Sequence, residues 1–348
     1  MTSPFRVLLV GCGGISSNWL RPTLASKQLE LVGLVDLSTS TAEARAAEFD
    51  IDTSKVHIGS DLQTALGTTK PDIVFNCTIP AAHFEVTTAA LQAGAHVLSE
   101  KPLADTMAEA HQMIALAKET GKTLAVMQNR RYNPSIRAVR KLLAGGLIGD
   151  ITTINADFYI GAHFGGFRDS MAHVLIKDMA IHTFDAARYL ISTRAEAVYC
   201  HEWNPAGSWY ERDASAQAIF EMTDSVVFNY RGSWSSEGQH TSWDSSWRIV
   251  GTKGSLTWDG VTGLSIDVVS GTGGFFSEFS KPDVPALEES DMTRWHGFAI
   301  DAFVDALAAG NTPETHAEDN IHSLAMVFAA IESAQQQARV LVDVETLT

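Results

Sequence analysis

The N-terminal stretch of the chain constrains its fold more than any other segment. An apolar run, Phe5–Val10, ends in the glycine cluster of residues 11–14, and a helical pattern begins at Ile15. From there to Met127, short apolar runs alternate with helical stretches. Strands that are apolar along their whole length, each followed by a helix, are typical of a parallel sheet covered on both faces. The first part of the chain is therefore predicted to be a doubly wound α/β domain.

The pattern changes near residue 128. Ile151–Ile160 alternates between apolar and polar residues, and a Gly-rich loop and a helix predicted over Val174–Leu190 follow it. Alternating strands then continue to Val269, and the Ser/Gly-rich segment Ser270–Ser280 is predicted to be an exposed loop. We therefore expect two domains: a Rossmann domain with a doubly wound parallel sheet over residues 1–127, and an α+β domain with an open, mostly antiparallel sheet over residues 128–348.

Composition excludes several classes of partner. The chain has 25 Lys and Arg against 41 Asp and Glu residues, a formal net charge of −16, which argues against binding to nucleic acid or to an anionic membrane. No apolar run is long enough to span a membrane, and the N-terminus reaches a strand without the features of a signal peptide. The three cysteines are far apart and form no CxxC motif. We therefore expect a cytoplasmic protein without a metal site.

The glycine cluster has the context of a dinucleotide-binding turn, because it follows a strand and opens a helix. Gly11 would permit the tight turn, and Gly13 would let the backbone approach a pyrophosphate. The helix that begins at Gly14 and Ile15 would supply N–H groups to the same phosphates. Ser16 stands at the third position of the pattern, where Gly or Ala is usual, and it is small enough to keep the helix close to the strand.

Asp36 ends the second predicted strand, 20 residues after Ser16. A carboxylate at this position would bond the adenosine ribose hydroxyls and repel a 2′-phosphate. No Arg or Lys follows within residues 37–41. The sequence therefore favours NAD as the cofactor and leaves NADP possible.

Two further strand ends carry polar residues. Thr78 and Pro80 follow the fourth strand, with His83 one turn later, and the sequence Glu100-Lys101-Pro102 follows the fifth. The carboxyl ends of parallel strands meet at one edge of a sheet, so these residues are expected to line the same crevice. Lys101 could reach both a nicotinamide ribose and a substrate hydroxyl.

The predicted helix Val174–Leu190 carries Asp178, His182 and Asp185 at spacing i, i+4, i+7, which places them on one face. A buried polar network would explain this stripe, and so would an acid–base device in a cleft. The residues of this helix alone do not separate the two explanations.

The motifs GCGGIS, EKP and D-x-x-x-H, in this order and spacing, resemble those of the Gfo/Idh/MocA family, the group of glucose–fructose oxidoreductase and inositol dehydrogenase. The resemblance implies a Rossmann domain, a second domain with an open antiparallel sheet, and NAD(P)-dependent oxidation of a sugar or cyclitol hydroxyl, or the reverse reduction. It also implies that Lys101, Asp178 and His182 are catalytic, and that Glu100, Thr78 and Pro80 contact the cofactor. Ser16 and the pair Met179-Ala180 depart from the usual family pattern.

A hydroxyl that loses hydride must also lose its proton, and a base of near-neutral pKa does this best. We therefore expect His182 to accept the proton, with Lys101 as the main competitor, and Asp178 to bond the hydroxyl or orient the imidazole; Asp185 is expected to support them. His83 and Gln128 complete the expected cofactor contacts. The expected substrate contacts are Lys101, Arg130, Asp157, Arg168, His173, Asp178 and His182. Trp234, Trp243 and Trp247 could lie under a sugar ring or be buried in the sheet.

The sequence thus predicts an NAD(P)-dependent dehydrogenase that oxidises a secondary hydroxyl of a sugar, sugar derivative or cyclitol. One alternative is glycoside cleavage through transient oxidation by bound NAD, and another is a non-catalytic dinucleotide-binding sensor. A zinc-dependent dehydrogenase is disfavoured, because Cys and His ligands are not clustered. The second domain's one-sided sheet, rich in apolar and Trp residues, predicts a homodimer or homotetramer formed through that sheet.

Overall fold

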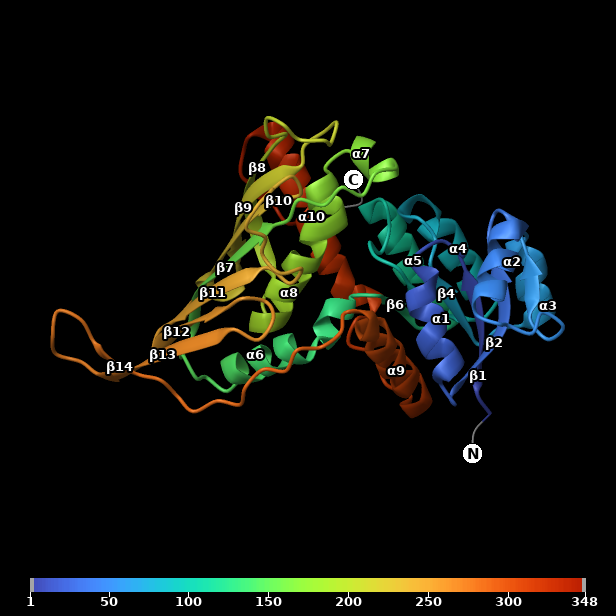
Figure 1. The fold of residues 1–348 in the computed structure, drawn as a ribbon, viewed down its shortest axis with the longest axis horizontal. Helices are drawn as coiled ribbons and strands as arrows, with labels where there is room; N and C mark the ends of the chain where they lie inside the picture. The colour runs from blue at the N-terminus through green and yellow to red at the C-terminus, as the bar shows by residue number, and fades with distance from the viewer. Residues whose placement is uncertain (1–2, 346–348) are drawn as a thin grey trace. The chain divides into compact units, whose positions relative to one another are not determined.

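The computed structural model of the chain describes residues 3–345, which form two compact units (Figure 1). The first unit comprises the chain up to Asn129 together with Asp291–Ile321, and the second comprises Arg130–Ser290 and His322–Val344. The predicted boundary between residues 127 and 128 lies close to the point, between Asn129 and Arg130, where the chain first passes from one unit to the other. The segment 291–321, which that boundary assigned to the second domain, groups with the first unit. In this segment, helix α9 (Thr293–Ala309) packs on α1 (Ser16–Ala25). The first unit is therefore made mainly of two segments of the chain that are separated by most of the second unit.

The first unit contains a six-stranded, entirely parallel sheet in the order β3-β2-β1-β4-β5-β6. The order reverses between β1 and β4, and ligands of such sheets bind outside the strand ends at this reversal. The predicted doubly wound fold is confirmed. The strands are β1 (Phe5–Val10), β2 (Leu29–Val35), β3 (His57–Gly59), β4 (Ile73–Asn76), β5 (His96–Ser99) and β6 (Leu124–Val126).

Two helices of this unit begin at side-chain caps. The side chain of Asp61 accepts a hydrogen bond from the backbone N of Thr64, 2.6 Å away, and Thr106 does the same for the N of Glu109, 3.1 Å away. Gly121, at φ +64°, ends the helix that Thr106 caps. Besides α1 and α9, the helices of this unit are α2 (Thr39–Glu48), α3 (Leu62–Thr69), α4 (Pro80–Gln92) and α5 (Met107–Thr120).

The second unit is built on a nine-stranded sheet in the order β14-β13-β12-β11-β7-β10-β9-β8-β15. Strands β10 and β7 pair in parallel, and the other neighbours pair antiparallel, which confirms the predicted mostly antiparallel sheet. The strands are β7 (Ile151–Tyr159), β8 (Ala195–Trp203), β9 (Ser215–Met222), β10 (Val227–Ser233), β11 (Ser246–Gly251), β12 (Gly254–Trp258), β13 (Leu264–Gly271), β14 (Glu278–Ser280) and β15 (Val340–Leu341).

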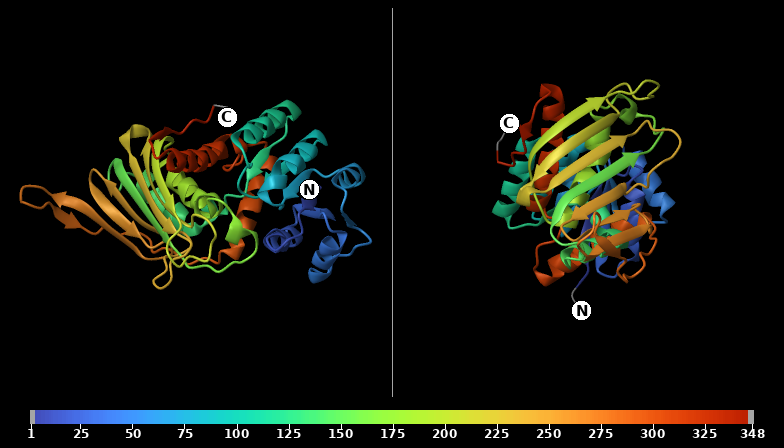
Figure 2. Two further views of the ribbon diagram at one scale, coloured as in Figure 1. Left: turned by 90° about the horizontal axis from the view of Figure 1, so that it is seen from above. Right: turned by 90° about the vertical axis from the view of Figure 1, so that its left-hand side faces the viewer.

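Helices cover one face of this sheet and leave the other open (Figure 2). The covering helices are α6 (Pro134–Ala144), α8 (Ile181–Ile191) and α10 (Ala317–Gln336). Phe184 of α8 packs edge-on against Phe220 and Tyr230 of the sheet, with ring centroids 4.9 and 5.2 Å apart. Trp234 and Trp247 are buried in the core of this unit. Of the two positions that the sequence left open for these residues, under a sugar ring or buried in the sheet, the structure shows burial, and their large rings stabilise the core.

The segment Ser270–Ser280 was predicted to be an exposed loop; residues 272–277 form one, and strand pairing continues on both sides of it. Strand β13 continues to Gly271, and β14 pairs with it, with Val269 opposite Phe279. Phe275 and Phe276 lie at the exposed turn of this hairpin, where their rings pack edge to face. Backbone pairing, rather than side-chain pattern, makes the two ends of the segment strands.

The predicted helix Val174–Leu190 is helical throughout, but its first part is of a different type. Residues Leu175–Ala180 form a π-helix, and α8 begins at Ile181. The extra residue in each hydrogen-bonded turn moves Asp178 out of the register that a continuous α-helix would give it. Within residues 3–345, no helix combines the length and apolar character that a membrane crossing requires.

Candidate active site

The glycine loop of the first unit fits a pyrophosphate. Gly11 has φ +92°, and a Cβ on it would stand 2.6 Å from the carbonyl carbon of Cys77 and 2.7 Å from the N of Thr78. Only glycine tolerates both this conformation and the close approach of the β4 end. A Cβ on Gly13 or Gly14 would meet no atom within 4 Å. The first glycine is thus required by packing, while the other two leave open space at the edge where a dinucleotide binds.

Two side chains hold this loop. Ser16, fully buried, donates from its hydroxyl to the carbonyl of Gly13 over 2.6 Å, so the departure from the usual Gly or Ala adds a hydrogen bond. Arg45 of α2 donates to the same carbonyl over 2.9 Å and to that of Cys12 over 3.3 Å. Sequence reasoning missed Arg45, because it searched for a cation only as far as residue 41. The one available signal was its place on the helix that follows Asp36.

Asp36 lies where β2 ends, as predicted. Its carboxylate accepts hydrogen bonds from the backbone N of Cys12, 2.8 Å away, and from that of Ser38, 3.0 Å away. It therefore links the second strand to the glycine loop. Leu37, which follows it, is 98% exposed, and Ile79 at the end of β4 is 63% exposed. Exposed apolar side chains at a strand-end crevice suit the flat ring of a nucleotide.

Thr78 and Pro80 lie in the turn after β4. The Thr78 hydroxyl donates to the Asn76 side-chain oxygen over 2.6 Å, and Pro80 is the first residue of α4. His83 is fully buried, with Nε2 3.1 Å from the Thr78 carbonyl oxygen and Nδ1 2.7 Å from that of Pro102. Burial lowers the pKa of His83, against the effect of these carbonyls. His83 thus bridges two strand-end turns.

Glu100 and Lys101 follow β5. The Glu100 side chain is buried and accepts a hydrogen bond from the indole N–H of Trp19 over 2.8 Å, while the next peptide bond, Lys101–Pro102, is cis. Gln128 follows β6, and within residues 3–345 its buried amide nitrogen and oxygen have no hydrogen-bond partner. An orphaned buried amide at this sheet edge matches the needs of a ligand with both a donor and an acceptor, such as a carboxamide.

In the second unit, Asp178 lies in the π-helix and is bound by Arg168 of the short helix α7 (Phe167–Ser170). Arg168 donates from Nε to Oδ2 over 2.8 Å and from Nη2 to Oδ1 over 3.3 Å. Its guanidinium also lies over the rings of Phe164 and Phe167, 4.9 and 4.8 Å from their centroids. His182 is in the first turn of α8 and is 9% exposed. Three residues predicted to meet the substrate therefore lie on adjoining segments.

The other predicted substrate residues are differently placed. Arg130 is buried, donates to the Trp243 carbonyl and pairs with Asp244 at 2.7 Å. Burial raises the pKa of Asp244, although Arg130 opposes this. His173 has φ +55°, and its Nδ1 lies 2.7 Å from the carboxylate of Glu202.

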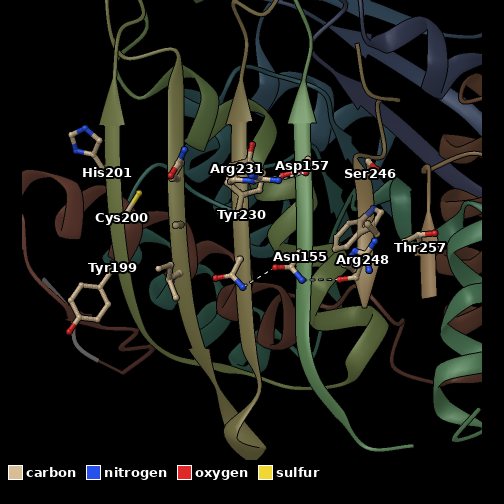
Figure 3. Close-up of a pocket in the computed structure, with 15 residues that line it drawn as sticks. Asn155, Asp157, Tyr199, Cys200, His201, Tyr230, Arg231, Ser246, Arg248 and Thr257 are labelled. Atoms are coloured by element: carbon tan, nitrogen blue, oxygen red, sulfur yellow. Dashed lines mark hydrogen bonds and ion pairs between the residues drawn. The ribbon is translucent and has the colours of Figure 1, made fainter. Parts of the chain in front are cut away.

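Asp157, predicted as a substrate contact, points to the open face of the sheet and pairs with Arg231 at 2.6 Å (Figure 3). Strand alternation explains the difference. Ile154, Ala156 and Phe158 point toward the helices, so their neighbour Asp157 cannot. The structure therefore does not bring Asp157 together with Asp178.

Asp185 anchors a buried network in the second unit. Arg131 donates to its two oxygens over 2.7 and 2.6 Å, and the Ser323 hydroxyl donates to Oδ1 over 2.7 Å. Arg188 in turn donates to Ser323 over 2.7 Å. Asp185 thus fixes α8 to neighbouring segments, while Asp178 pairs with Arg168.

Comparison with known proteins decides the family. A model described as an oxidoreductase family with an NAD-binding Rossmann fold matches residues 5–128, and the GFO/IDH/MocA C-terminal domain model matches residues 136–257. The chain belongs to the Gfo/Idh/MocA oxidoreductase family. It is therefore an oxidoreductase whose first unit is an NAD-binding Rossmann fold, and the resemblance seen in its sequence motifs is confirmed.

Members of this Gfo/Idh/MocA family are similar to the chain over much of its length. It is 30% identical over 214 residues, 60% of each chain, to the D-glucoside 3-dehydrogenase of Escherichia coli (strain K12). It is 26% identical to the 1,5-anhydro-D-fructose reductase of Ensifer adhaerens over 332 residues, 94% of this chain and 95% of the relative. The structure of an inositol dehydrogenase homolog from Azotobacter vinelandii, complexed with NADH and myo-inositol, matches with a TM-score of 0.80 at 19% identity over 98% of both chains.

Proposed function

We propose that this oxidoreductase removes hydride from a secondary hydroxyl carbon of a sugar, sugar derivative or cyclitol, with His182 and Lys101 handling the proton. One observation carries the proposal. The first unit contains both a glycine loop that is open to a pyrophosphate and a lysine just after the end of β5. The named activities of the relatives, on a glucoside and on an anhydro sugar, support this substrate class.

The first unit would hold NAD at the strand ends. Open space at Gly13 and Gly14 would admit the pyrophosphate, Asp36 would bond the ribose, and the amide of Gln128 would meet the carboxamide. Thr78 and Pro80 would line the crevice between them. When bound, the nicotinamide supplies the hydride acceptor. The negative charge of Asp36 disfavours a 2′-phosphate, so NADP would bind more weakly.

Three polar residues predicted to be catalytic would handle the proton. His182 would accept it from the hydroxyl, since a neutral imidazole is the suitable base near neutral pH. Lys101 would stabilise the oxygen as negative charge develops, by charge and by hydrogen bonding. Asp178, whose two oxygens accept hydrogen bonds from Arg168, would bond the hydroxyl or orient His182.

A substrate panel tests this proposal. Sugars, sugar acids, glycosides and inositols are supplied first with NAD and then with NADP, and the absorbance of reduced nicotinamide is followed. We expect at least one polyol to reduce NAD, and NADP less efficiently. If no polyol reduces either cofactor, the dehydrogenase proposal fails. Release of an aglycone without net reduction of NAD would instead support glycoside cleavage through transient oxidation.

We also propose that the open face of the nine-stranded sheet is a homodimer interface. The face is hollowed by a groove of about 790 Å³ lined by polar and apolar side chains (Figure 3). Asp157 and Arg231 pair on its central strands. A two-fold axis at this point would bring Asp157 of one copy near Arg231 of the other. Tyr199 and Ile219, each 49% exposed and paired across β8 and β9, would add apolar area.

Light scattering after gel filtration tests the interface. We expect a dimer or a larger even-numbered assembly for the native chain and a monomer for Ile219→Arg. A monomeric native chain would overturn this part of the proposal without touching the activity.

We further propose a reducing, cytoplasmic setting. The three cysteines lie within the described residues and are free. Burial, aided by Asp36 and opposed by Arg45, raises the pKa of the Cys12 thiol to about 12. Thiols kept protonated in this way are inert structural residues, as is usual in reducing compartments. Fractionation of cells that carry the native chain tests the setting; recovery with secreted proteins would contradict it.

A further inference from the structure

Glu100 is buried in the first unit, directly before Lys101. Its side chain is 10% exposed; Oε1 accepts a hydrogen bond from the indole of Trp19 over 2.8 Å, and Oε2 accepts one from the backbone N of Lys101 over 3.2 Å. A buried carboxylate is costly unless its oxygens are satisfied. Both oxygens are therefore already engaged by the protein.

A third group reaches this carboxylate from a distant part of the sequence. His296 of α9 places Nε2 3.5 Å from Oε1 of Glu100, and its Nδ1 lies 3.4 Å from the amide nitrogen of Asn129. An amide nitrogen only donates, so Nδ1 is the acceptor and Nε2 carries the hydrogen toward Glu100. Asn129 thus selects the tautomer of His296 that suits a carboxylate.

The three partners together keep Glu100 ionised. Burial alone would raise the pKa of Glu100, but His296, Trp19 and the charge of Lys101 hold it below its ordinary value. Trp19 and His296 also touch each other edge-on, with ring centroids 6.2 Å apart. The carboxylate is therefore fixed between α1, which follows the glycine loop, and α9.

The turn that bears Lys101 is held on both sides. Glu100 is fixed as described, and the carbonyl of Pro102 contacts Nδ1 of the buried His83 at 2.7 Å. Lys101 lies between these two anchors, at the end of β5. Small displacements of a reacting group cost large factors in rate, so the anchors matter for chemistry as well as for folding.

We infer that Trp19 and His296 are positioning residues for Lys101, acting through the carboxylate of Glu100; the inference rests on the proposed role of Lys101. Residues 291–321 therefore supply part of the reaction apparatus of the first unit. Glu100 itself is a positioning residue, since its oxygens are taken by Trp19, His296 and the Lys101 backbone.

A double-mutant cycle between His296→Leu and Lys101→Ala tests this inference. We expect His296→Leu to lower kcat about tenfold with KM for the polyol little changed. NADH affinity, followed by fluorescence titration, should stay within about twofold, because no cofactor contact is removed. In the Lys101→Ala background, His296→Leu should have almost no further effect, since residues that act as a unit are not additive. His296→Asn, which keeps an N–H donor, should restore most of the lost turnover.

Matched variants separate this inference from a purely structural role. His316→Leu, in the segment that follows α9, should leave turnover normal. If His296→Leu does not fold, Trp19→Phe removes only the indole donor and enters the same cycle. Normal turnover in the His296 and Trp19 variants, or an equal loss with and without Lys101, overturns the inference. Normal turnover in Lys101→Ala alone overturns the proposed role of Lys101 instead.

Discussion

Arg168 holds the carboxylate of Asp178 through two hydrogen bonds, 2.8 Å from Nε to Oδ2 and 3.3 Å from Nη2 to Oδ1. The pair joins a four-residue helix after the Gly-rich loop to the π-helix that precedes α8. A π-turn changes the register of its residues, and such turns are frequent at functional sites. The orientation of Asp178 therefore depends on Arg168 as well as on the helix.

Replacing Arg168 tests this dependence. Because only a planar guanidinium spans both oxygens of Asp178, we expect Arg168→Ala to lower kcat/KM about 10- to 100-fold and Arg168→Lys to restore only part of it. Arg339→Ala is a matched control, since Arg339 binds Glu221 through two hydrogen bonds of the same kind on the surface. Steady-state kinetics on a turned-over polyol checks the result. Equal effects of Arg168→Ala and Arg339→Ala would speak against a role of Arg168 at the site.

The two glycines of the loop should respond differently to alanine. Gly11→Ala forces a Cβ to 2.6 Å from Cys77 at φ +92°, so we expect the free energy of unfolding to fall by about 2–4 kcal/mol. Gly13→Ala meets no atom, so stability should change by less than about 1 kcal/mol while NAD affinity falls about tenfold or more. Urea unfolding and NADH fluorescence titration measure the two effects. If Gly13→Ala binds NADH with normal affinity, the proposal that the cofactor contacts the loop at Gly13 is wrong.

Asp36→Asn should change the choice of cofactor. The amide oxygen can still accept from the N of Cys12, so the loop is retained while the charge that repels a 2′-phosphate is lost. We expect the ratio of kcat/KM with NAD to that with NADP to fall about tenfold or more. Ser38→Ala, which removes a hydroxyl hydrogen-bonded to that of Ser40, is the neighbouring control. An unchanged ratio would show that Asp36 does not select NAD.

Glu100 predicts a pH dependence of stability. His296, Trp19 and Lys101 outweigh burial and hold the pKa of Glu100 below its ordinary 4.5, so the unfolded state binds a proton more readily than the folded state. The ionised carboxylate contributes its full amount to the free energy of unfolding when the pH is above that ordinary pKa, and this contribution is lost as the pH falls through the folded-state pKa. Glu100→Gln should therefore reduce the free energy of unfolding by about 1–2 kcal/mol near neutral pH, and by less near about pH 3.

Urea unfolding of both proteins across this pH range measures the difference. Glu318→Gln removes an exposed carboxylate, paired with Lys118 at 2.6 Å, and is the control for a surface charge. We expect the stability difference between the native chain and Glu100→Gln to shrink as the pH falls. A difference that grows as the pH falls would contradict the lowered pKa of Glu100.

Much of the fold follows from the sequence because its signals are local. Apolar runs, the glycine turn and caps such as Asp61 and Thr106 act over a few residues, and their elements lie where the pattern predicts. The departures are tertiary. Strand β14 forms because Phe279 pairs with Val269, and α9 joins the first unit because it packs on α1. Neither contact has a signature in the residues that make it.

The residues of the site likewise fall into those that local sequence signals predict and those that they do not. Gly11, Asp36 and Lys101 lie at strand ends, which the sequence predicts from the parallel pattern. Arg45 and His296 could not be predicted, because each acts through a partner distant in the chain. Asp157, predicted to contact the substrate, lies on the open face of the sheet, since one residue of strand register decides which face a side chain occupies.

The most direct test of the proposed chemistry is single-turnover oxidation by Lys101→Ala and His182→Ala, followed by reduced-nicotinamide absorbance, with NADH affinity measured alongside. We expect each variant to bind NADH normally and to oxidise the polyol at least about 100-fold more slowly than the native chain. Oxidation at a near-native rate in both variants would contradict the assignment of proton handling to Lys101 and His182.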